Sequence, residues 1–262
     1  MATAHDDMPT APSVADRYTL SWEQKAVLEQ ADRFARERLH PLQARMDDEE
    51  WWPEGVMAEC AEYGFLGLTA PARFGGADMD IFSAMLVGQA FAKWNPAFAL
   101  SWGAHENLCL NNILRNGTEA QLEKWLPGLC SGEQIGALGL TEPGAGSDAL
   151  EGMRTTARRD GDEWVLDGRK LYITNGPIAD VLLVYAKTDP TAGAQGISAF
   201  IVERGTKGFR PGRKEDKLGV RCSDTSQLFF EDCRVPEENL LGEEGHGFLD
   251  ALQILDEGRV VE

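Results

Sequence analysis

The sequence predicts an α+β protein: an N-terminal all-α helical bundle, then an antiparallel β-sandwich or barrel, then the start of a truncated C-terminal helical domain. Apolar residues recur at helical spacing from residue 21 to about residue 130. Short β-prone runs separated by turn residues follow between residues 164 and 235. From residue 247 the spacing is helical again, and the sequence stops at residue 262.

These patterns divide the chain into four parts. A length of 262 residues is enough for two modest domains that each bury a core. Residues 1–18 are small, polar and proline-containing, so we expect a mobile tail. The other predicted parts are an N-terminal helical domain (19–133), a middle β-domain (134–242) and the start of a C-terminal helical domain (243–262).

The helices of the first domain are predicted from caps and apolar spacing. Ser21 and Gln24 spell a capping box, and the helix that they begin should run until Pro41 interrupts it. Thr118 and Gln121 spell a second capping box. Further helices are expected at 53–63, 79–93, 97–116 and 118–129, with a tight loop over 65–76.

Aromatic residues at helical spacing usually indicate core packing rather than a cofactor site. We therefore expect the tryptophans of this half to lie in its core; they are Trp22, Trp94, Trp102 and Trp125. His105 has no metal-ligand spacing to the other histidines, so a buried, hydrogen-bonded role is favoured over a catalytic one.

Period-two patterns predict the strands of the second domain. Residues 164–166 and 170–174 flank Asp167-Gly168, which predicts a hairpin turn at that dipeptide. Three more strands are expected over residues 180–187, 196–203 and 227–235.

Bulk composition narrows the class of protein. The 25 basic and 43 acidic side chains give a net charge of -18, which disfavours nucleic-acid and anionic-membrane surfaces. Five widely spaced cysteines form no C-x-x-C pair, so neither a disulfide framework nor a zinc site is indicated. The first eighteen residues lack the pattern of a leader peptide, and a cytoplasmic protein is expected.

The best clue to function is the stretch 138–148, which reads LGLTEPGAGSD. Pro143 fixes one backbone angle, while Gly144 and Gly146 permit angles closed to larger residues. Such a loop brings backbone N–H groups close to a ligand, and its Thr and Ser hydroxyls can bond a planar heterocycle. Composition alone favours a polar interdomain turn.

The amino-acid sequences of several segments resemble those of the acyl-CoA dehydrogenase family, flavoenzymes that desaturate acyl-CoA thioesters. TEPGAGSD and KLYITNG (170–176) resemble its two signature segments. SWGAH (101–105), DKLGVR (216–221) and FEDCRVP (230–236) also resemble family segments, in the family's order. The similarity extends from about residue 20 to residue 261 and is closest to the isovaleryl-CoA dehydrogenase type.

The resemblance implies α,β-dehydrogenation of a short or branched acyl-CoA by α-proton abstraction and β-hydride transfer to FAD. The sequence contains neither a strand-G-x-G-x-x-G-helix unit nor a G-K-[ST] loop, so a dinucleotide-fold or P-loop cofactor site is not supported. The resemblance implies instead a flavin held on the β-domain. The implied flavin residues are Leu138, Gly139, Leu140, Thr141, Gly146, Ser147, Tyr172, Ile173 and Thr174. Tyr172 stands where the family often has Trp, and Ser147 would also bond the CoA portion.

The resemblance does not supply a catalytic base. The isovaleryl type carries its Glu at the position of Gly258, and most of the family carries it in a C-terminal domain beyond this sequence. Glu257 is one residue away, but neighbouring helical residues point about 100° apart, so a solvated carboxylate is favoured. Asp256 and Arg259 match the family segment and would contact the acyl-CoA.

The family pattern also implies a homotetramer and electron transfer to an electron-transfer flavoprotein or a similar carrier. Two other functions stay open. A non-catalytic binding or scaffold subunit would keep the fold and lack the base, as Gly258 suggests, and an acyl-CoA oxidase would pass its electrons to oxygen.

Overall fold

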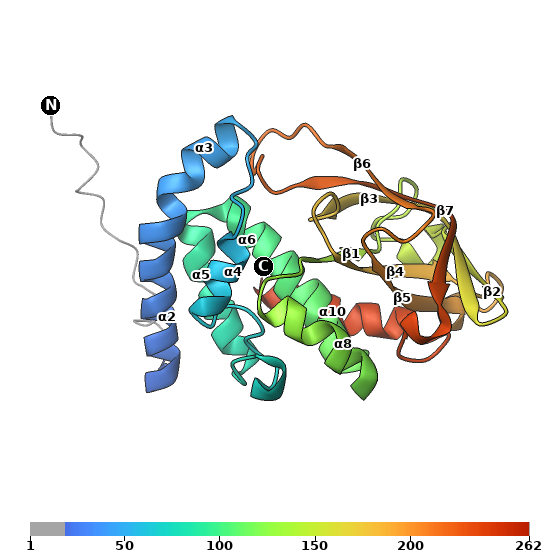
Figure 1. Ribbon diagram of the computed structural model, residues 1–262, viewed down its shortest axis with the longest axis horizontal. Helices are drawn as coiled ribbons and strands as arrows, with labels where there is room; N and C mark the ends of the chain where they lie inside the picture. Colours follow the sequence, from blue (N-terminus) through green and yellow to red (C-terminus); the bar gives the residue numbers. More distant parts are fainter. Residues whose placement is uncertain (1–18, 262) are drawn as a thin grey trace, which may run out of the picture.

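The computed structural model describes residues 19–261, and the predicted tail over residues 1–18 lies outside them. The predicted fold class is confirmed: a helical N-terminal part and a sheet lie side by side, and a C-terminal helix follows (Figure 1). The four domain boundaries stay predictions.

The helical part contains both predicted capping boxes, at Ser21–Gln24 and Thr118–Gln121. Its core is a group of mutually packed aromatic rings that includes Phe34, Phe65, Phe91, Phe98 and Trp102. Its elements are α2 (Trp22–Phe34), the π-helix η1 (Ala35–Leu39), the 3₁₀ turn η2 (His40–Leu42), α3 (Gln43–Asp48), α4 (Val56–Glu62), η3 (Ala72–Phe74), α5 (Ile81–Trp94), α6 (Pro96–Gly103), the π-helix η4 (Ala104–Leu110), α7 (Asn111–Asn116) and α8 (Glu119–Cys130).

Two expectations for this part are wrong. Pro41 does not stop the helical course, because it lies in the first turn of η2, where its missing N–H is not needed. Trp22 is not in the core: it is 75% exposed at the start of α2, whereas Trp102 and Trp125 are buried.

The second part is one eight-stranded sheet in the order β6-β7-β3-β2-β4-β5-β8, with β1 also paired to β4. It is mostly antiparallel, but β1 and β2 each pair with β4 in parallel. Parallel pairing needs a long connection, which no short-range pattern reveals. The strands are β1 (Gly136–Gly139), β2 (Thr156–Asp160), β3 (Glu163–Thr174), β4 (Val181–Lys187), β5 (Ile197–Glu203), β6 (Phe209–Lys214), β7 (Thr225–Pro236) and β8 (Leu240–Leu241); short turns form α9 (Ala149–Gly152), η5 (Gly193–Gly196) and η6 (Glu237–Asn239).

The sheet curls so that its two halves, on either side of β2, share one apolar core. Trp164 and Phe230, from β3 and β7, pack in the same cluster as Leu182 and Phe200, from β4 and β5. The opposite face of β4 and β5 packs on the helices through residues such as Leu183, Tyr185 and Ile201, together with Leu126 of α8. This second core holds the helical part against the sheet.

The predicted hairpin at Asp167-Gly168 is wrong. Residues 163–174 form one continuous strand, and the turn lies at Gly161-Asp162, between β2 and β3. Gly168 instead has φ +151°, beside a register shift in the β3–β7 pairing. A Cβ at Gly168 would come within 2.5 Å of the Thr155 hydroxyl, so glycine is needed here for close approach.

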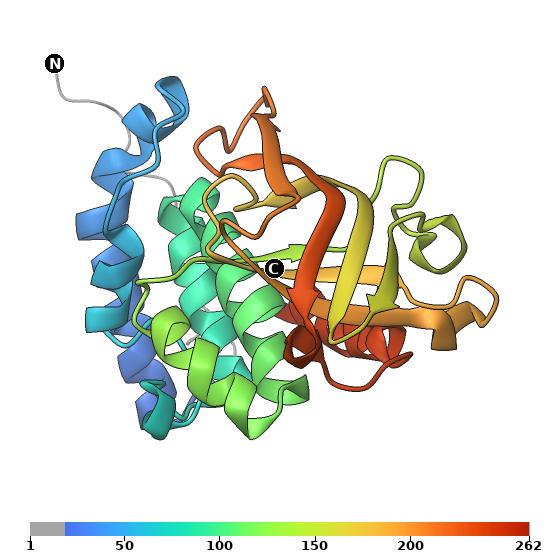
Figure 2. The ribbon, with the colours of Figure 1, turned by 45° about the vertical axis from the view of Figure 1, so that its right-hand side comes forward.

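The last described element is α10 (Gly247–Val261), which packs on η4, α5 and β5 (Figure 2). Gly258 faces inward, and a Cβ placed on it would lie 3.4 Å from Leu108. Within residues 19–261 the helices are too short or too polar to cross a membrane. The five cysteines are all buried with free thiols.

We predict that Gly168→Ala lowers the free energy of unfolding by about 2 kcal/mol, because the methyl group collides with Thr155 and the backbone angle becomes strained. Urea titration followed by circular dichroism measures this change. Gly161→Ala, at a turn glycine with open space around it, controls for backbone strain alone. Equal losses in the two variants would contradict the packing explanation.

Candidate functional site

The two signature segments lie against each other. The Leu171 backbone N–H donates to the Thr141 carbonyl at 2.8 Å. The Lys170 ammonium donates to the Leu140 carbonyl at 3.2 Å. A loop and a strand that are 30 residues apart in sequence therefore meet along one edge, as a single flavin site formed by both segments needs.

A buried ion pair fixes this contact. Lys170 Nζ lies 2.7 Å from Glu142 Oε1, and both side chains are almost wholly buried. Glu142 also accepts the backbone N–H groups of Arg154 (2.6 Å) and Thr155 (3.0 Å). Burial alone would raise the pKa of Glu142, but the Lys170 charge and these hydrogen bonds lower it overall. Burial lowers the pKa of Lys170 to about 8, against the opposing effect of Glu142.

The loop that follows Glu142 is tight at its start and open at its tip. Glu142 and Ala145 exchange two backbone hydrogen bonds, of 2.9 and 3.0 Å. Asp148 then caps α9 by accepting from the Glu151 N–H at 3.3 Å. Gly144 and Gly146 have open space where a Cβ would stand, and Ser147 is exposed. The tip of the loop thus exposes backbone groups at Gly144 and Gly146 next to the Ser147 hydroxyl.

Tyr172 is held in an unusual position. Its backbone has φ +59°, rare for an aromatic residue, at a register shift between Lys170 and Ile173 in the β3–β7 pairing. Its side chain is 64% exposed, next to the loop. The bulge exposes a large aromatic ring to water and strains the backbone, and both effects are unfavourable for folding. Residues with such strain and exposure concentrate at binding sites.

The other predicted cofactor residues fall into two groups. Leu138 and Leu140 pack on the core beneath the loop, and Gly139 and Ile173 are buried. These four build the platform. The hydroxyls of Thr141, Ser147 and Thr174 form the second group, and they make no side-chain hydrogen bond within residues 19–261. They are available to a ligand.

Sequence reasoning missed an arginine-lined cleft of about 530 Å³ beside the loop, which Glu142 and Glu231 also line. Arg169 of β3 and Arg210 of β6 flank Phe229 of β7 in the sheet register, and the Arg210 guanidinium lies 4.1 Å from the Phe229 ring centre. Arg154 and Gly144 also line this cleft. Only the register, which the sequence does not show, reveals that these arginines are neighbours.

Two of the predicted substrate residues, Asp256 and Arg259, lie on α10. Asp256 and Arg259 pair with each other at 2.6 Å on the exposed side of the helix. Glu257 forms an ion pair with Arg115 of α7 at 2.8 Å, so this carboxylate links two helices. Ser147, the other predicted substrate residue, lies on the loop between β1 and α9, and the substrate role of all three stays a prediction.

His105 and Glu106 act as connectors inside the helical part. His105 bonds the Leu129 carbonyl at 3.1 Å and accepts the Gly136 N–H at 3.0 Å, which confirms its structural role. Burial lowers the pKa of His105 to about 4. Glu106 accepts the N–H groups of Gly67 and Leu68, at 2.8 and 2.6 Å, and burial raises its pKa to about 7.

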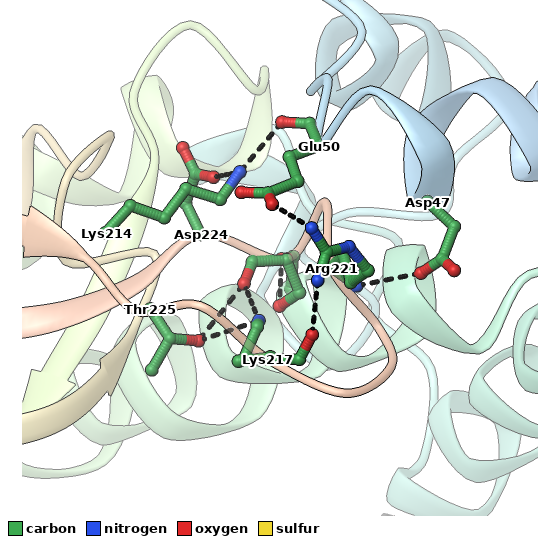
Figure 3. Close-up of polar contacts among 9 residues, drawn as sticks. Asp47, Glu50, Lys214, Lys217, Arg221, Asp224 and Thr225 are labelled. Carbon is green, nitrogen blue, oxygen red and sulfur yellow. Dashed lines mark hydrogen bonds and ion pairs between the residues drawn. The ribbon is translucent and has the colours of Figure 1, made fainter.

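A polar network joins the helical part to the strand that carries Thr174 (Figure 3). Arg221, between β6 and β7, donates through its backbone N–H to Asp47 at 3.0 Å and pairs with Glu50. Lys214 bonds the Glu50 carbonyl at 2.8 Å and pairs with Asp224. The Asp224 carbonyl in turn accepts the Asn175 N–H at 2.7 Å, so the network reaches the end of β3.

Comparison with known proteins identifies this arrangement. The family model "Acyl-CoA dehydrogenase, N-terminal domain" matches residues 21–133, and "Acyl-CoA dehydrogenase, middle domain" matches residues 137–233. The chain belongs to the acyl-CoA dehydrogenase family. The helical part and most of the sheet therefore correspond to two domains of that family.

Individual relatives agree. Mitochondrial isovaleryl-CoA dehydrogenase from Pongo abelii is 43% identical over 267 residues, which cover 98% of this chain and 61% of the relative. Butyryl-CoA dehydrogenase from Megasphaera elsdenii has a TM-score of 0.88 at 41% identity, covering 92% of this chain and 64% of that one. Glutaryl-CoA dehydrogenase from Mycobacterium smegmatis, solved with FADH2, has a TM-score of 0.84 at 34% identity, covering 92% and 60%. The chain thus spans about three fifths of these acyl-CoA dehydrogenases.

We predict that Lys170→Met and Glu142→Gln each lower the free energy of unfolding by about 3 kcal/mol, because each leaves a buried polar group unpaired. The double variant should lose less than the sum of the two. Urea titration of all four proteins gives the coupling energy. Additive losses would show that the pair does not stabilise the loop contact.

We also predict a pH signature for Glu106. The folded state holds the Glu106 proton up to about pH 7, whereas the unfolded state releases it near pH 4.5, so this carboxyl's contribution to stability is lost as pH rises between those values. The free energy of unfolding of the wild type, minus that of Glu106→Gln, should fall by up to about 3 kcal/mol from pH 4.5 to pH 8. Denaturant titrations at several pH values measure this difference. Because His105 is present in both proteins, its opposing contribution cancels in this difference. A difference in free energy that does not change with pH would contradict the prediction.

Proposed function

We propose that this chain is the N-terminal and middle part of an FAD-dependent acyl-CoA dehydrogenase that acts on short or branched acyl groups. The observation that carries the proposal is the contact between Thr141 and Leu171, which places a glycine-rich loop beside an outward-turned tyrosine. The relatives named for isovaleryl-CoA and butyryl-CoA support the substrate class.

The residues present fit a flavin. A flavin needs hydrogen bonds at the polar edge of its ring, an apolar or aromatic contact on its face, and positive charge or N–H groups for its diphosphate. Thr141 and Thr174 supply free hydroxyls, and Tyr172 supplies an exposed ring. The open backbone at Gly144 and Gly146 and the arginine-lined cleft supply the third requirement. When bound, FAD would supply the hydride acceptor that amino-acid side chains lack.

In this proposal the chain's own residues hold and orient the reactants. With a flavin bound, Thr141 and Thr174 would hold the ring edge, and Tyr172 would shield the ring from water. Ser147, at the open end of the loop, bonds the CoA portion of the substrate. Arg154 and Arg169 offset the repulsion that a chain of net charge -18 exerts on phosphates.

The α-proton needs a separate base. Gly258 offers no carboxylate, and Glu257 is paired with Arg115. We therefore assign proton abstraction to a carboxylate from outside residues 1–262, in keeping with the greater length of the relatives. By family resemblance we also propose assembly as a homotetramer and re-oxidation by an electron-transfer flavoprotein or a similar carrier.

The test is the colour of the protein expressed from its intact gene. We expect a yellow protein that bleaches when butyryl-CoA or isovaleryl-CoA is added without oxygen. A colourless protein that takes up no added FAD would refute the proposal. Yellow protein that binds acyl-CoA and never bleaches would instead support a binding subunit, and peroxide formation in air would indicate an oxidase.

Thr174→Val should weaken FAD binding about fivefold, because it removes one hydrogen bond worth about 1 kcal/mol. Quenching of flavin fluorescence during titration measures the dissociation constant. Thr156→Val, at an exposed position of β2 that is not a predicted cofactor residue, is the matched control. Equal dissociation constants for Thr174→Val and wild type would place Thr174 outside the cofactor site.

A further inference from the structure

Lys217 has no role in the proposed function so far, but its ammonium lies next to the end of β3. It lies in the connection between β6 and β7, in the DKLGVR segment. Its ammonium donates to the Ser223 carbonyl and, at 3.2 Å, to the Thr225 hydroxyl (Figure 3). The side chain is only partly exposed, so its charge is less well hydrated than that of a surface lysine.

The sheet register places this ammonium on the face that carries Thr174. Thr225 of β7 is the direct antiparallel partner of Thr174 in β3, and partners in a sheet point to the same side. Their neighbours Ile173 and Ser226 are also partners, and Ile173 points into the sheet core. Thr174, Thr225 and the Lys217 ammonium therefore share the outward face.

Lys217 differs from the cations around it. Arg221 pairs with Glu50 and Asp216, and Lys214 pairs with Asp224. Lys217 has no carboxylate within ion-pair distance in the part of the chain that the structure describes. Its direct partners are an uncharged carbonyl and a hydroxyl, and the carboxylates of Asp224 and Glu50 act on its charge only from beyond contact distance, as does the like charge of Lys214.

The surrounding network holds Lys217 in place. Ser223, whose carbonyl accepts its proton, bonds the Ser101 hydroxyl at 2.8 Å in the buried interior. Ser101 in turn accepts through its carbonyl from the Asn175 amide at 2.8 Å. Arg221 Nη1 donates to the Lys217 carbonyl at 2.6 Å. The ammonium therefore keeps a fixed distance from Thr174, which a flexible surface lysine would not.

We infer that Lys217 is an electrostatic residue of the cofactor site, whose positive charge raises the reduction potential of a flavin bound against Thr174. The inference rests on the proposed function. Reduction adds negative charge to the ring, and a fixed cation on the same face stabilises that charge more than it stabilises the neutral oxidised form. Lys217 thereby favours transfer of the substrate hydride without touching the substrate.

The decisive measurement is the two-electron midpoint potential of the holoprotein, determined by reduction against a reference dye. Lys217→Met should shift the ratio of reduced to oxidised flavin about tenfold toward the oxidised form, about 30 mV for a two-electron couple. Lys217→Arg should retain the wild-type potential, because it keeps the charge. Lys207→Met, an exposed lysine of the same domain, controls for loss of net charge and should leave the potential unchanged.

The outcomes separate this inference from the proposed function. Wild-type protein that binds no flavin refutes both. Flavin-loaded Lys217→Met with the wild-type potential refutes the role of Lys217 alone, as does an equal shift in Lys207→Met. If Lys217→Met does not retain flavin, Lys217→Gln keeps an N–H donor for the Ser223 carbonyl and should show the same fall in potential. A wild-type potential in that variant would also overturn the inference.

Discussion

The buried pair between Glu142 and Lys170 is the interaction on which the rest of the site depends. Placing two charges where water cannot reach them is unfavourable unless each is fully bonded. Glu142 meets this condition with Lys170 and two backbone N–H groups, and Lys170 meets it with Glu142 and the Leu140 carbonyl. The pair therefore stabilises one register between loop and strand, since a shift of one residue would turn Lys170 to the opposite face.

That register explains the strain next to it. With Lys170 held inward and Ile173 in the sheet core, two residues remain to cross a gap that one residue of β7 spans. The chain resolves this as a bulge, and Tyr172 takes a left-handed backbone and points outward. The exposed ring is thus a consequence of two buried neighbours. Directly after the strand, the Arg221 network ties Asn175 to the helical part, so β3 is fixed on both sides of Tyr172 and Thr174.

The sequence alone predicted what depends on local pattern. It predicted the capping boxes, most of the helices and the role of His105, because each depends on residues that are neighbours in sequence. It also predicted that the two signature segments lie close together, because both match family motifs. Features that depend on register were not predicted. Asp167-Gly168 has the composition of a turn, yet tertiary contact with Thr155 makes it part of a strand. The arginine cleft arises from three strands far apart in sequence. For Lys170 the sequence offered one signal. A lysine beside the apolar residues of a predicted strand is unusual, and it could have indicated a buried ion pair.

The buried carboxylates also bear on where the base for the reaction can come from. Among residues 19–261 the buried acids are Glu106 and Glu142. Glu106, with a pKa of about 7, would suit proton abstraction by its acidity alone. Both of its oxygens, however, accept N–H groups from the 67–68 backbone, and using them would release that loop. Glu142 is bound by Lys170 and two N–H groups. Each buried acid thus maintains the architecture, which supports the proposal that the proton acceptor lies outside residues 19–261.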